Sequence, residues 1–524
     1  MLQPAVEPAS STTQSACRRI SPWFWVPVIY GMQAIPVTMV SEVSTLTLKD
    51  LGFENLLIVT WTSLVTLPWT LKLFWAPLVD LNFTKRGWVV AMQTALTLAL
   101  IAWAGCVAVG GSFGILILLL LFLAILSATH DISCDGLYLM SLDRRQQAFF
   151  CGVQTTCYRL GRLFCTGVLV WLAGALMGRI GWSASHAWGC ALGTAGVLYG
   201  VAAVWNRYAL PAPSEDRPKL RLFDPTNLSN LGRTLLVVII GLGSYFFVRS
   251  GLFLLGAMFH RLTGVYDIAW VPPSWEMSRN DVHHYASIAM VSGSGIVFLI
   301  WLARRWLQGT EMGTAFSSFV HQSGFFAILG FIVFYRFGEA MISKMSPLFY
   351  RDSIEKGGLG ISTEVIGLIN GVAGVGGILL GGIVGAWFIS RRGLRKSLVP
   401  LILSMSVPNL LYVWASVSHP PVWMIFGVAF VDQFGYGFGF AGYIIYLMYV
   451  AQRGNFQTTH YAIGTGLGML TIILAGIVSG IVQQVFGYTG MFIVACLAAI
   501  PGMLILWVIP MDNEQTRTLK PIVE

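Results

Sequence analysis

The sequence predicts an all-α, polytopic membrane protein with two six-helix bundles and two inserted helices, and three observations support this. Of 524 residues, 56% are hydrophobic and only 10% are charged, whereas soluble proteins carry about 25% charged residues. About fourteen segments are long and apolar enough to cross a hydrocarbon core about 30 Å thick. In order, the expected spans are 22–41, 56–80, 88–109, 113–140, 148–177, 186–207, 233–260, 284–303, 324–350, 363–389, 397–417, 421–450, 459–484 and 488–510.

Weak internal similarity, the third observation, indicates two matching halves. QAFFCG (Gln147–Gly152) opens the fifth span, and HYAIG (His460–Gly464) opens the thirteenth. The loop with Lys85 and Arg86 after the second span resembles RRGLRK (Arg391–Lys396) after the tenth. If these pairs correspond, the seventh and eighth spans are an insertion between two six-helix units. Two such units are typical of a transporter whose halves rock about a central site.

A polar stretch rich in proline follows the sixth span and suits a linker between the halves. The expected organisation is a cytoplasmic tail at 1–21, an N-terminal bundle at 22–207, a cytoplasmic linker at 208–232, two inserted helices with an external loop at 233–303, a cytoplasmic connection at 304–323, a C-terminal bundle at 324–510 and a cytoplasmic tail at 511–524.

The formal charge of +9 is divided among short loops, which argues against a nucleic-acid-binding face. Alternate expected loops carry about twenty Lys and Arg on one side and about six on the other. The positive-inside rule therefore places both termini in the cytoplasm. The eight cysteines form no C-x-x-C pair, and neither G-x-x-x-x-G-K-[ST] nor H-E-x-x-H occurs. Neither a metal site nor a cofactor is expected.

Several charged residues lie inside the apolar spans. A charge at the bilayer centre costs about 2.5–3.5 kcal/mol on insertion scales, so such residues are expected to face a protein interior or a wet cavity. The embedded cations are Lys72, Arg159, Arg162, Arg336, Lys344 and Arg249, and the embedded acids are Asp131, Asp135, Glu339 and Asp432. This set predicts a polar pathway through the membrane.

In the fourth span, Asp131 and Asp135 are four residues apart and share one helix face. Burial and like charge both favour protonation of such a pair, so one of them is a candidate proton carrier. The alternative is a structural pair neutralised by arginine or backbone donors.

Tyr158, Arg159 and Arg162 in the fifth span are the expected partners of this pair and are candidate substrate-binding residues. Arginine keeps its proton and offers a fork of donors that fits a carboxylate. One hypothesis is a switch in which protonation of Asp131 or Asp135 frees Arg159 to bind an anionic substrate group. Simple neutralisation of the aspartates by Arg159 is the alternative.

Two later spans add candidate residues. Arg336 and Glu339, three residues apart in the ninth span, either pair with each other or line a cavity. Arg336 is a candidate substrate-binding residue, and Glu339 is a further proton-coupling candidate. The twelfth span contributes three residues suited to binding a hydroxyl-rich ligand, although its glycines also suit a packing seam: Asp432, Gln433 and Tyr436.

The remaining candidates have structural alternatives. Gly377, Gly381 and Gly385 recur every four residues, which predicts close helix packing. A lone histidine is more often structural than functional, although it titrates near neutral pH. Four charged or titratable residues near span ends are assigned gating or structural roles: Lys72, Asp80, Arg86 and His460.

Four motifs resemble signatures of the AmpG-like permeases and the related acetyl-CoA transporters of the major facilitator superfamily. They are LKLFWAPLVD (Leu71–Asp80), ATHDISCDG (Ala128–Gly136), YRLG (Tyr158–Gly161) and YRFGEA (Tyr335–Ala340). The resemblance implies the twelve-helix facilitator fold plus two inserted helices, in the bacterial inner membrane. It also implies proton-coupled import of anhydro-muropeptides released in cell-wall turnover, with Asp131 and Asp135 required. His130 stands where the family usually has Gln.

The expected partners are therefore a small sugar-peptide substrate, protons and membrane lipid, with no nucleic acid. A siderophore or an acyl-CoA remains an alternative substrate. From another class, the chain would be a membrane enzyme that acts on a lipid-linked sugar with Asp131 and Asp135 as acid and base. An enzyme would not need two matching halves, so the sequence favours a transporter over an enzyme.

Overall fold

The computed structural model describes residues 21–72, 79, 83–142, 144–213, 216, 297, 301, 305, 311–453 and 457–511. Nearly all of the two expected inserted helices at 233–303 lies outside the described residues. So do Asp80, Arg249, the tails at 1–20 and 512–524, and most of the linker at 208–232.

The N-terminal half is a bundle of long helices, several of them in consecutive pieces. Its elements are α1 (Val26–Thr38), the π-helical turn η2 (Met39–Val43), α2 (Ser44–Asp50), α3 (Asn55–Leu64), α5 (Lys85–Ala108), α6 (Phe113–Ser141), α7 (Arg144–Leu163), the π-helical turn η3 (Phe164–Leu169), α8 (Val170–Ile180) and α9 (Ala184–Ala209). The helix of α1, η2 and α2 continues to Asp50. Hydroxyls along it find partners within the helix by donating to carbonyls four residues earlier, as Ser44 does to Val40 and Thr47 to Val43.

The C-terminal half repeats this pattern. Its elements are α12 (Glu311–Val320), α13 (Phe325–Arg351), α14 (Thr363–Leu368), the π-helical turn η5 (Ile369–Gly374), α15 (Val375–Arg392), α16 (Leu394–Ser406), α17 (Asn409–Ser418), α18 (Val422–Gln452) and α19 (Gln457–Ile505). Within α19 two helices meet at Gly487, whose φ of 68° and ψ of −175° suit glycine.

Ten helices in the described residues are long and apolar enough to cross a membrane, and one of them covers both helices of α19. No strand occurs in these parts of the chain. The expected all-α, polytopic fold is therefore confirmed. The count of fourteen spans stays a prediction, because nearly all of the segment expected to form the two inserted helices lies outside the described residues.

The expected glycine packing seam is also confirmed. A Cβ added at Gly377, Gly381 or Gly385 of α15 would lie 2.4, 2.1 and 2.6 Å from backbone carbonyl oxygens of α18. Glycine at these positions therefore lets the two helices pack backbone to backbone.

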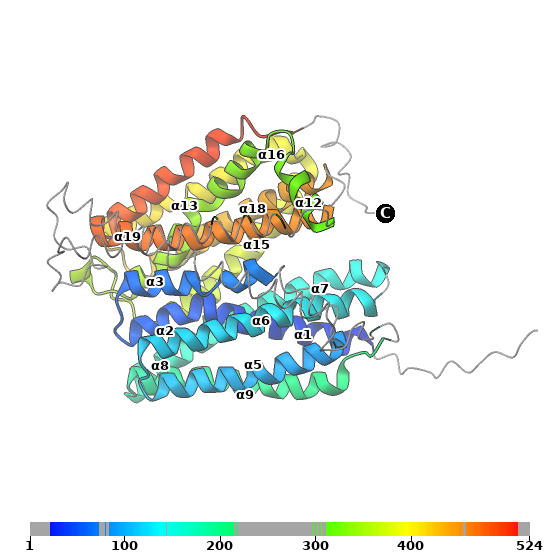
Figure 1. Ribbon diagram of the computed structural model, residues 1–524. Helices are drawn as coiled ribbons and strands as arrows, with labels where there is room; N and C mark the ends of the chain where they lie inside the picture. Colours follow the sequence, from blue (N-terminus) through cyan, green and yellow to red (C-terminus); the bar gives the residue numbers. More distant parts are fainter. Residues whose placement is uncertain are drawn as a thin grey trace, which may run out of the picture.

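The two halves lie side by side and meet closely near one end. Helices α2, α3 and α8 of the first half contact α13, α19 and α14 of the second half, respectively. In Figure 1, α3 lies next to α19 at one end, whereas α7 and α12 at the other end are farther apart. Two glycine contacts bring the halves together: a Cβ on Gly174 would lie 2.0 Å from the Glu364 nitrogen, and one on Gly367 would lie 2.4 Å from the Trp171 nitrogen. The π-helical turns η3 and η5 touch across the same interface.

Candidate functional site

A cavity of about 630 Å³ lies between the two halves, at the level of the three π-helical turns. π-Helical turns within α-helices are frequent at functional sites. The cavity takes its polar lining from both halves: Tyr30, Gln33, Glu42, Asp135, Gln154, Tyr158, Arg159 and Arg162 from the first, and Arg336, Glu339, Lys344, Asp432, Gln433 and Tyr436 from the second. Nine of the ten residues expected to couple protons or bind substrate therefore line one chamber, and the tenth, Asp131, is held by the lining residue Gln33.

Asp131 lies just behind the cavity wall. Gln33 donates a hydrogen bond to it at 2.8 Å, and the Lys72 ammonium is 3.6 Å away. Asp135, one helical turn later, lines the cavity and accepts a hydrogen bond from Tyr30 at 3.2 Å. The two aspartates thus share a helix face as expected, but they have different partners.

The expected pairing of Arg159 with these aspartates does not occur. Lys72 takes that place beside Asp131, while Arg159 extends across the cavity to within 3.4 Å of where a Cβ would lie on Gly382 in the opposite half. Gly382 leaves room there for the guanidinium. Arg159 lines the cavity and forms no ion pair with any residue that the structure describes.

Arg162 pairs instead with Glu42 at 3.0 Å. Glu42 is not among the residues expected from the sequence, because the first span was predicted to end at residue 41. An acid inside an apolar span would have been a signal, since the helix in fact continues to Asp50. Lys344 was expected to be embedded but was given no role, and it donates to the Ser41 carbonyl across the two halves at 3.0 Å.

Arg336 is held mainly by aromatic rings. Its guanidinium lies 5.4, 4.7 and 5.4 Å from the ring centres of Tyr436, Phe440 and Tyr443, and it donates to the Tyr436 hydroxyl at 2.9 Å. Cation–π contacts of this kind stabilise a desolvated guanidinium. The expected pair with Glu339 is present, but at 3.8 Å.

The acids on this wall are only partly satisfied. The Oε2 atom of Glu339 is buried and has no hydrogen-bond partner among the described residues. Asp432 accepts hydrogen bonds from Gln433 at 3.0 Å and from Tyr412 at 3.3 Å. Buried polar atoms without partners are rare, and at a cavity wall they fit a ligand or water.

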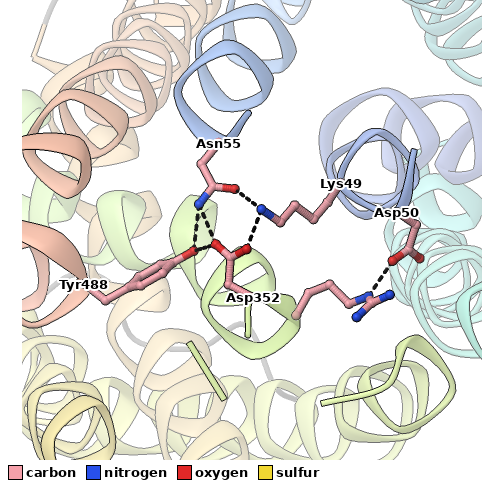
Figure 2. A network of polar contacts seen from close by, with 6 residues as sticks. Lys49, Asp50, Asn55, Asp352 and Tyr488 are labelled. Atoms are coloured by element: carbon pink, nitrogen blue, oxygen red, sulfur yellow. Dashed lines mark hydrogen bonds and ion pairs between the residues drawn. The ribbon is translucent and has the colours of Figure 1, made fainter. Parts of the chain in front are cut away.

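At the end where the halves meet, two aspartates form ion pairs and hydrogen bonds between the halves (Figure 2). We call the residues of these two clusters the latch: Lys49, Asp50, Asn55, Arg351, Asp352 and Tyr488. Asp352 of the second half binds Lys49 at 2.5 Å and accepts hydrogen bonds from Asn55 at 2.7 Å and Tyr488 at 2.6 Å. Burial raises the pKa of Asp352, but the hydrogen bonds from Lys49, Tyr488 and Asn55 outweigh it and hold the pKa below its usual range.

Asp50 of the first half has a matching set of partners. It accepts hydrogen bonds from Arg351 at 2.5 Å, Thr363 at 2.7 Å and Trp188 at 2.9 Å. The two ion pairs of the latch are therefore symmetric. Each half ends its first long helix with a cation followed by an aspartate, Lys49–Asp50 in the first half and Arg351–Asp352 in the second. Each cation pairs with the aspartate of the other half. Arg179 and Glu364 form a third ion pair between the halves.

Two further expected residues lie away from the cavity. His460 is buried and bonds Ser318 at 2.8 Å and Gln322 at 3.0 Å, so it packs the α12 region onto the start of α19. Arg86 donates to the Arg207 carbonyl at 2.9 Å on the surface. Both contacts are structural. Asp80, as stated, is outside the described residues.

Known proteins that resemble this chain in sequence include several named as transporters or permeases. A family model described as "Acetyl-coenzyme A transporter 1" matches residues 23–116. The anhydromuropeptide permease of Escherichia coli K12 is 21% identical over 91% of this chain and 75% of its own length. A putative transporter AmpG 4 of Rickettsia conorii is 21% identical over 92% of this chain and 94% of its own. An uncharacterised Haemophilus influenzae protein is 26% identical, over 38% of this chain and 48% of its own length.

Solved transporter structures share the fold at low sequence identity. A POT family transporter in complex with a thioalcohol-conjugated peptide aligns with a TM-score of 0.57 at 13% identity, covering 92% of this chain and 93% of that one. The inward-open xylose transporter XylE of E. coli aligns with a TM-score of 0.56 at 10% identity, covering 94% and 97%. The resemblance to AmpG-like permeases expected from the motifs is confirmed. The chain is therefore a multi-pass helical membrane protein with the fold of major facilitator transporters, similar over most of its length to AmpG-type anhydromuropeptide permeases.

Proposed function

We propose that this chain is a proton-coupled secondary transporter that imports anhydro-muropeptides across the bacterial inner membrane by alternating access. The observation that carries the proposal is the cavity of about 630 Å³ between the halves, lined from both sides by cations, carboxylates, tyrosines and glutamines. Its volume is within the range of about 300–1,000 Å³ usual for small-molecule sites. The permease names of the relatives support the choice of substrate.

The chemistry of the walls suits a sugar-peptide that bears carboxylates. Arg159 has no carboxylate partner among the described residues and presents its fork of donors to the cavity. Gln154, Gln433 and Tyr158 line the same space and supply hydrogen-bonding groups for sugar hydroxyls. In this proposal Arg159 binds a substrate carboxylate, and the rings around Arg336 form the facing wall.

The closed latch supports a conformation in which the cavity is open to the cytoplasm. The count of Lys and Arg in the loops assigns the latch to the external side and both termini to the cytoplasm. With the latch closed and the halves farther apart at the other end (Figure 1), the cavity would be accessible from the cytoplasm. Outward opening then requires both Lys49–Asp352 and Asp50–Arg351 to separate.

Proton coupling is assigned to carboxylates in and beside the cavity, with Asp131, Asp135 and Glu339 as the candidates from the sequence. Asp135 and Glu339 line the cavity, and neither makes an ion pair closer than 3.8 Å with a described residue. Each elementary charge moved across 100 mV contributes about 2.3 kcal/mol, so one or two protons suffice for substantial accumulation.

An acyl-CoA is the second candidate substrate, because the family model that matches residues 23–116 is described as an acetyl-coenzyme A transporter. Both substrates are anionic and both would use Arg159. A membrane enzyme is less well supported, because the fold neighbours are named as transporters.

The test is uptake of labelled anhydro-muropeptide into proteoliposomes under an inward proton gradient. We expect uptake that unlabelled anhydro-muropeptide abolishes and that acetyl-CoA or a siderophore leaves unchanged. Arg159→Gln should lower uptake at low substrate by at least about tenfold, since a charge-assisted hydrogen bond contributes about 1.5–3 kcal/mol. Arg391→Gln, a matched change of an exposed arginine, should have no effect. Competition by acetyl-CoA, or no uptake at all, would contradict the proposed substrate.

A further inference from the structure

Glu42 is an acid inside the first long helix that faces the cavity. It lies on the π-helical turn η2, where backbone hydrogen bonds join residues five apart instead of four. Its side chain is 38% exposed, and its Oε1 is 3.0 Å from Arg162. The carboxylate is therefore paired with a cation and is also reachable from the cavity.

Cations of both halves act on this one turn. Arg162 of the first half binds the Glu42 carboxylate, and Lys344 of the second half donates to the carbonyl of the adjacent Ser41 at 3.0 Å. A change in the charge of Glu42 therefore alters its ion pair with Arg162 within the first half. It does so next to the Lys344–Ser41 hydrogen bond that joins the two halves.

Other titratable groups surround Glu42. The groups that interact with it electrostatically are Arg162 and Tyr158 of α7, Cys165 of η3, Lys344 of α13 and Tyr436 of α18. Of the other elements packed on η2, α1 carries Tyr30, α2 carries Lys49 and Asp50, α6 carries His130, Asp131, Cys134, Asp135 and Tyr138, and α3 carries none.

We propose that Glu42 is a further coupling acid, in addition to the carboxylates named above, and that its protonation frees Arg162 for the substrate. This rests on the proposed function. A proton from external water bonds to the Glu42 carboxylate, the carboxyl becomes neutral, and its ion pair with Arg162 is lost. Arg162 then acts with Arg159, one helical turn away on α7, as a pair of guanidinium groups for a substrate carboxylate. After the substrate leaves to the cytoplasm, Arg162 rebinds Glu42 and the proton returns to water on that side.

The geometry favours Glu42 over Asp131 for this role. Asp131 is 6% exposed, does not line the cavity, and is held by Gln33 and Lys72. Its protonation would free Lys72. The cation that Glu42 holds is itself part of the cavity lining, beside Arg159.

The test compares two kinds of transport by the Glu42→Gln variant in proteoliposomes with the membrane potential clamped. The first is accumulation of labelled anhydro-muropeptide driven by a pH gradient, which for each coupled proton reaches about tenfold per pH unit in the native chain. The second is exchange of labelled for unlabelled substrate without a gradient. We expect the variant to lose gradient-driven accumulation and to keep exchange. Glu355→Gln, at an exposed position outside the spans, should keep both.

Other outcomes distinguish failure of the role of Glu42 from failure of the proposed transport function. Loss of exchange together with accumulation, or retention of both, would overturn the role of Glu42. A native chain that transports no anhydro-muropeptide would refute the proposed function instead. The charge-reversed pair Glu42→Arg with Arg162→Glu separates structure from coupling: an ion pair with only a structural role would recover gradient-driven accumulation, and a coupling pair would not.

A second measurement does not depend on folding of the variants. Hydrophobic carbodiimides modify protonated carboxyl groups, so labelling of Glu42 in the native chain, located by mass spectrometry, should rise when anhydro-muropeptide engages Arg162. Unchanged labelling of Glu42 with saturating substrate would contradict the proposal.

Discussion

The latch gives the most quantitative prediction. Asp352→Asn removes the charge of a nearly fully buried carboxylate, 5% exposed, while keeping its size. The carboxylate binds Lys49 at 2.5 Å and accepts two further hydrogen bonds. Breaking a buried ion pair costs about 3–5 kcal/mol. Lys49, the charge that the substitution leaves unpaired, is 13% exposed and lines an open vestibule from which water can solvate it, so we expect a smaller cost of about 2–3 kcal/mol.

Because these contacts join the halves only when the latch is closed, the cost falls on the closed conformation. We expect the ratio of closed to open molecules to fall by about 30- to 150-fold. Spin labels at Glu54 and Glu355, both exposed at this end and on opposite halves, report it in a background without native cysteines. The distance distribution measured by double electron–electron resonance should gain a longer component in Asp352→Asn.

Matched substitutions act as controls. Lys49→Gln should also lengthen the distance. Lys356→Gln should not, because Lys356 lines the same vestibule but forms no ion pair with a described residue. A distribution in Asp352→Asn identical to that of the native chain would refute the role of the latch.

Three further predictions concern pH, packing and buried charge. The pKa of Asp352 is lowered when the latch is closed. The contribution of Asp352 to closure is therefore complete above the usual carboxyl pKa of about 4 and is lost as the pH falls through the lowered value. The spin-label distance should be constant from neutral pH to about pH 5 and lengthen only in stronger acid, and this pH dependence should be absent in Asp352→Asn. Gly174→Ala places a methyl group 2.0 Å from the Glu364 nitrogen and should favour separation of the halves in the same spectra, whereas Gly178→Ala on the same helix, with nothing within 4 Å, should not. Lys72→Met leaves Asp131 without its cation and should lower the thermal unfolding temperature in detergent, a loss that Asp131→Asn combined with Lys72→Met should partly reverse; an equally unstable double variant would contradict the pairing.

The sequence was sufficient for the fold class and for most cavity residues, because embedded charges have few places to go. Arg159, Arg336 and Glu339 lie in apolar spans, and a shared polar interior follows from the cost of exposing them to lipid. The pairing of these charges was not predictable. Lys72 lies beside Asp131 in place of Arg159, since pairing depends on how each helix is rotated in the bundle.

Glu42 and the latch were missed for a different reason. The run from Ser41 to Asp50 is rich in Ser and Thr and resembles the end of a span. It is nevertheless helical, and its hydroxyls are satisfied within the helix because they donate to carbonyls four residues earlier. Lys49 and Asp50 therefore counted as loop charges. Their partners Arg351 and Asp352 are about 300 residues away in the sequence, and no local pattern connects them.

Alternating access requires a cavity that both halves form and that the latch closes on one side. A reversible crosslink tests this most directly. Glu54→Cys and Ser353→Cys place thiols on opposite walls of the vestibule beside the latch, and a short bifunctional reagent with a cleavable disulfide would hold the halves together there. We expect the crosslinked protein to take up no labelled anhydro-muropeptide and to recover on addition of a reductant. Full uptake by completely crosslinked protein would contradict alternating access between these halves.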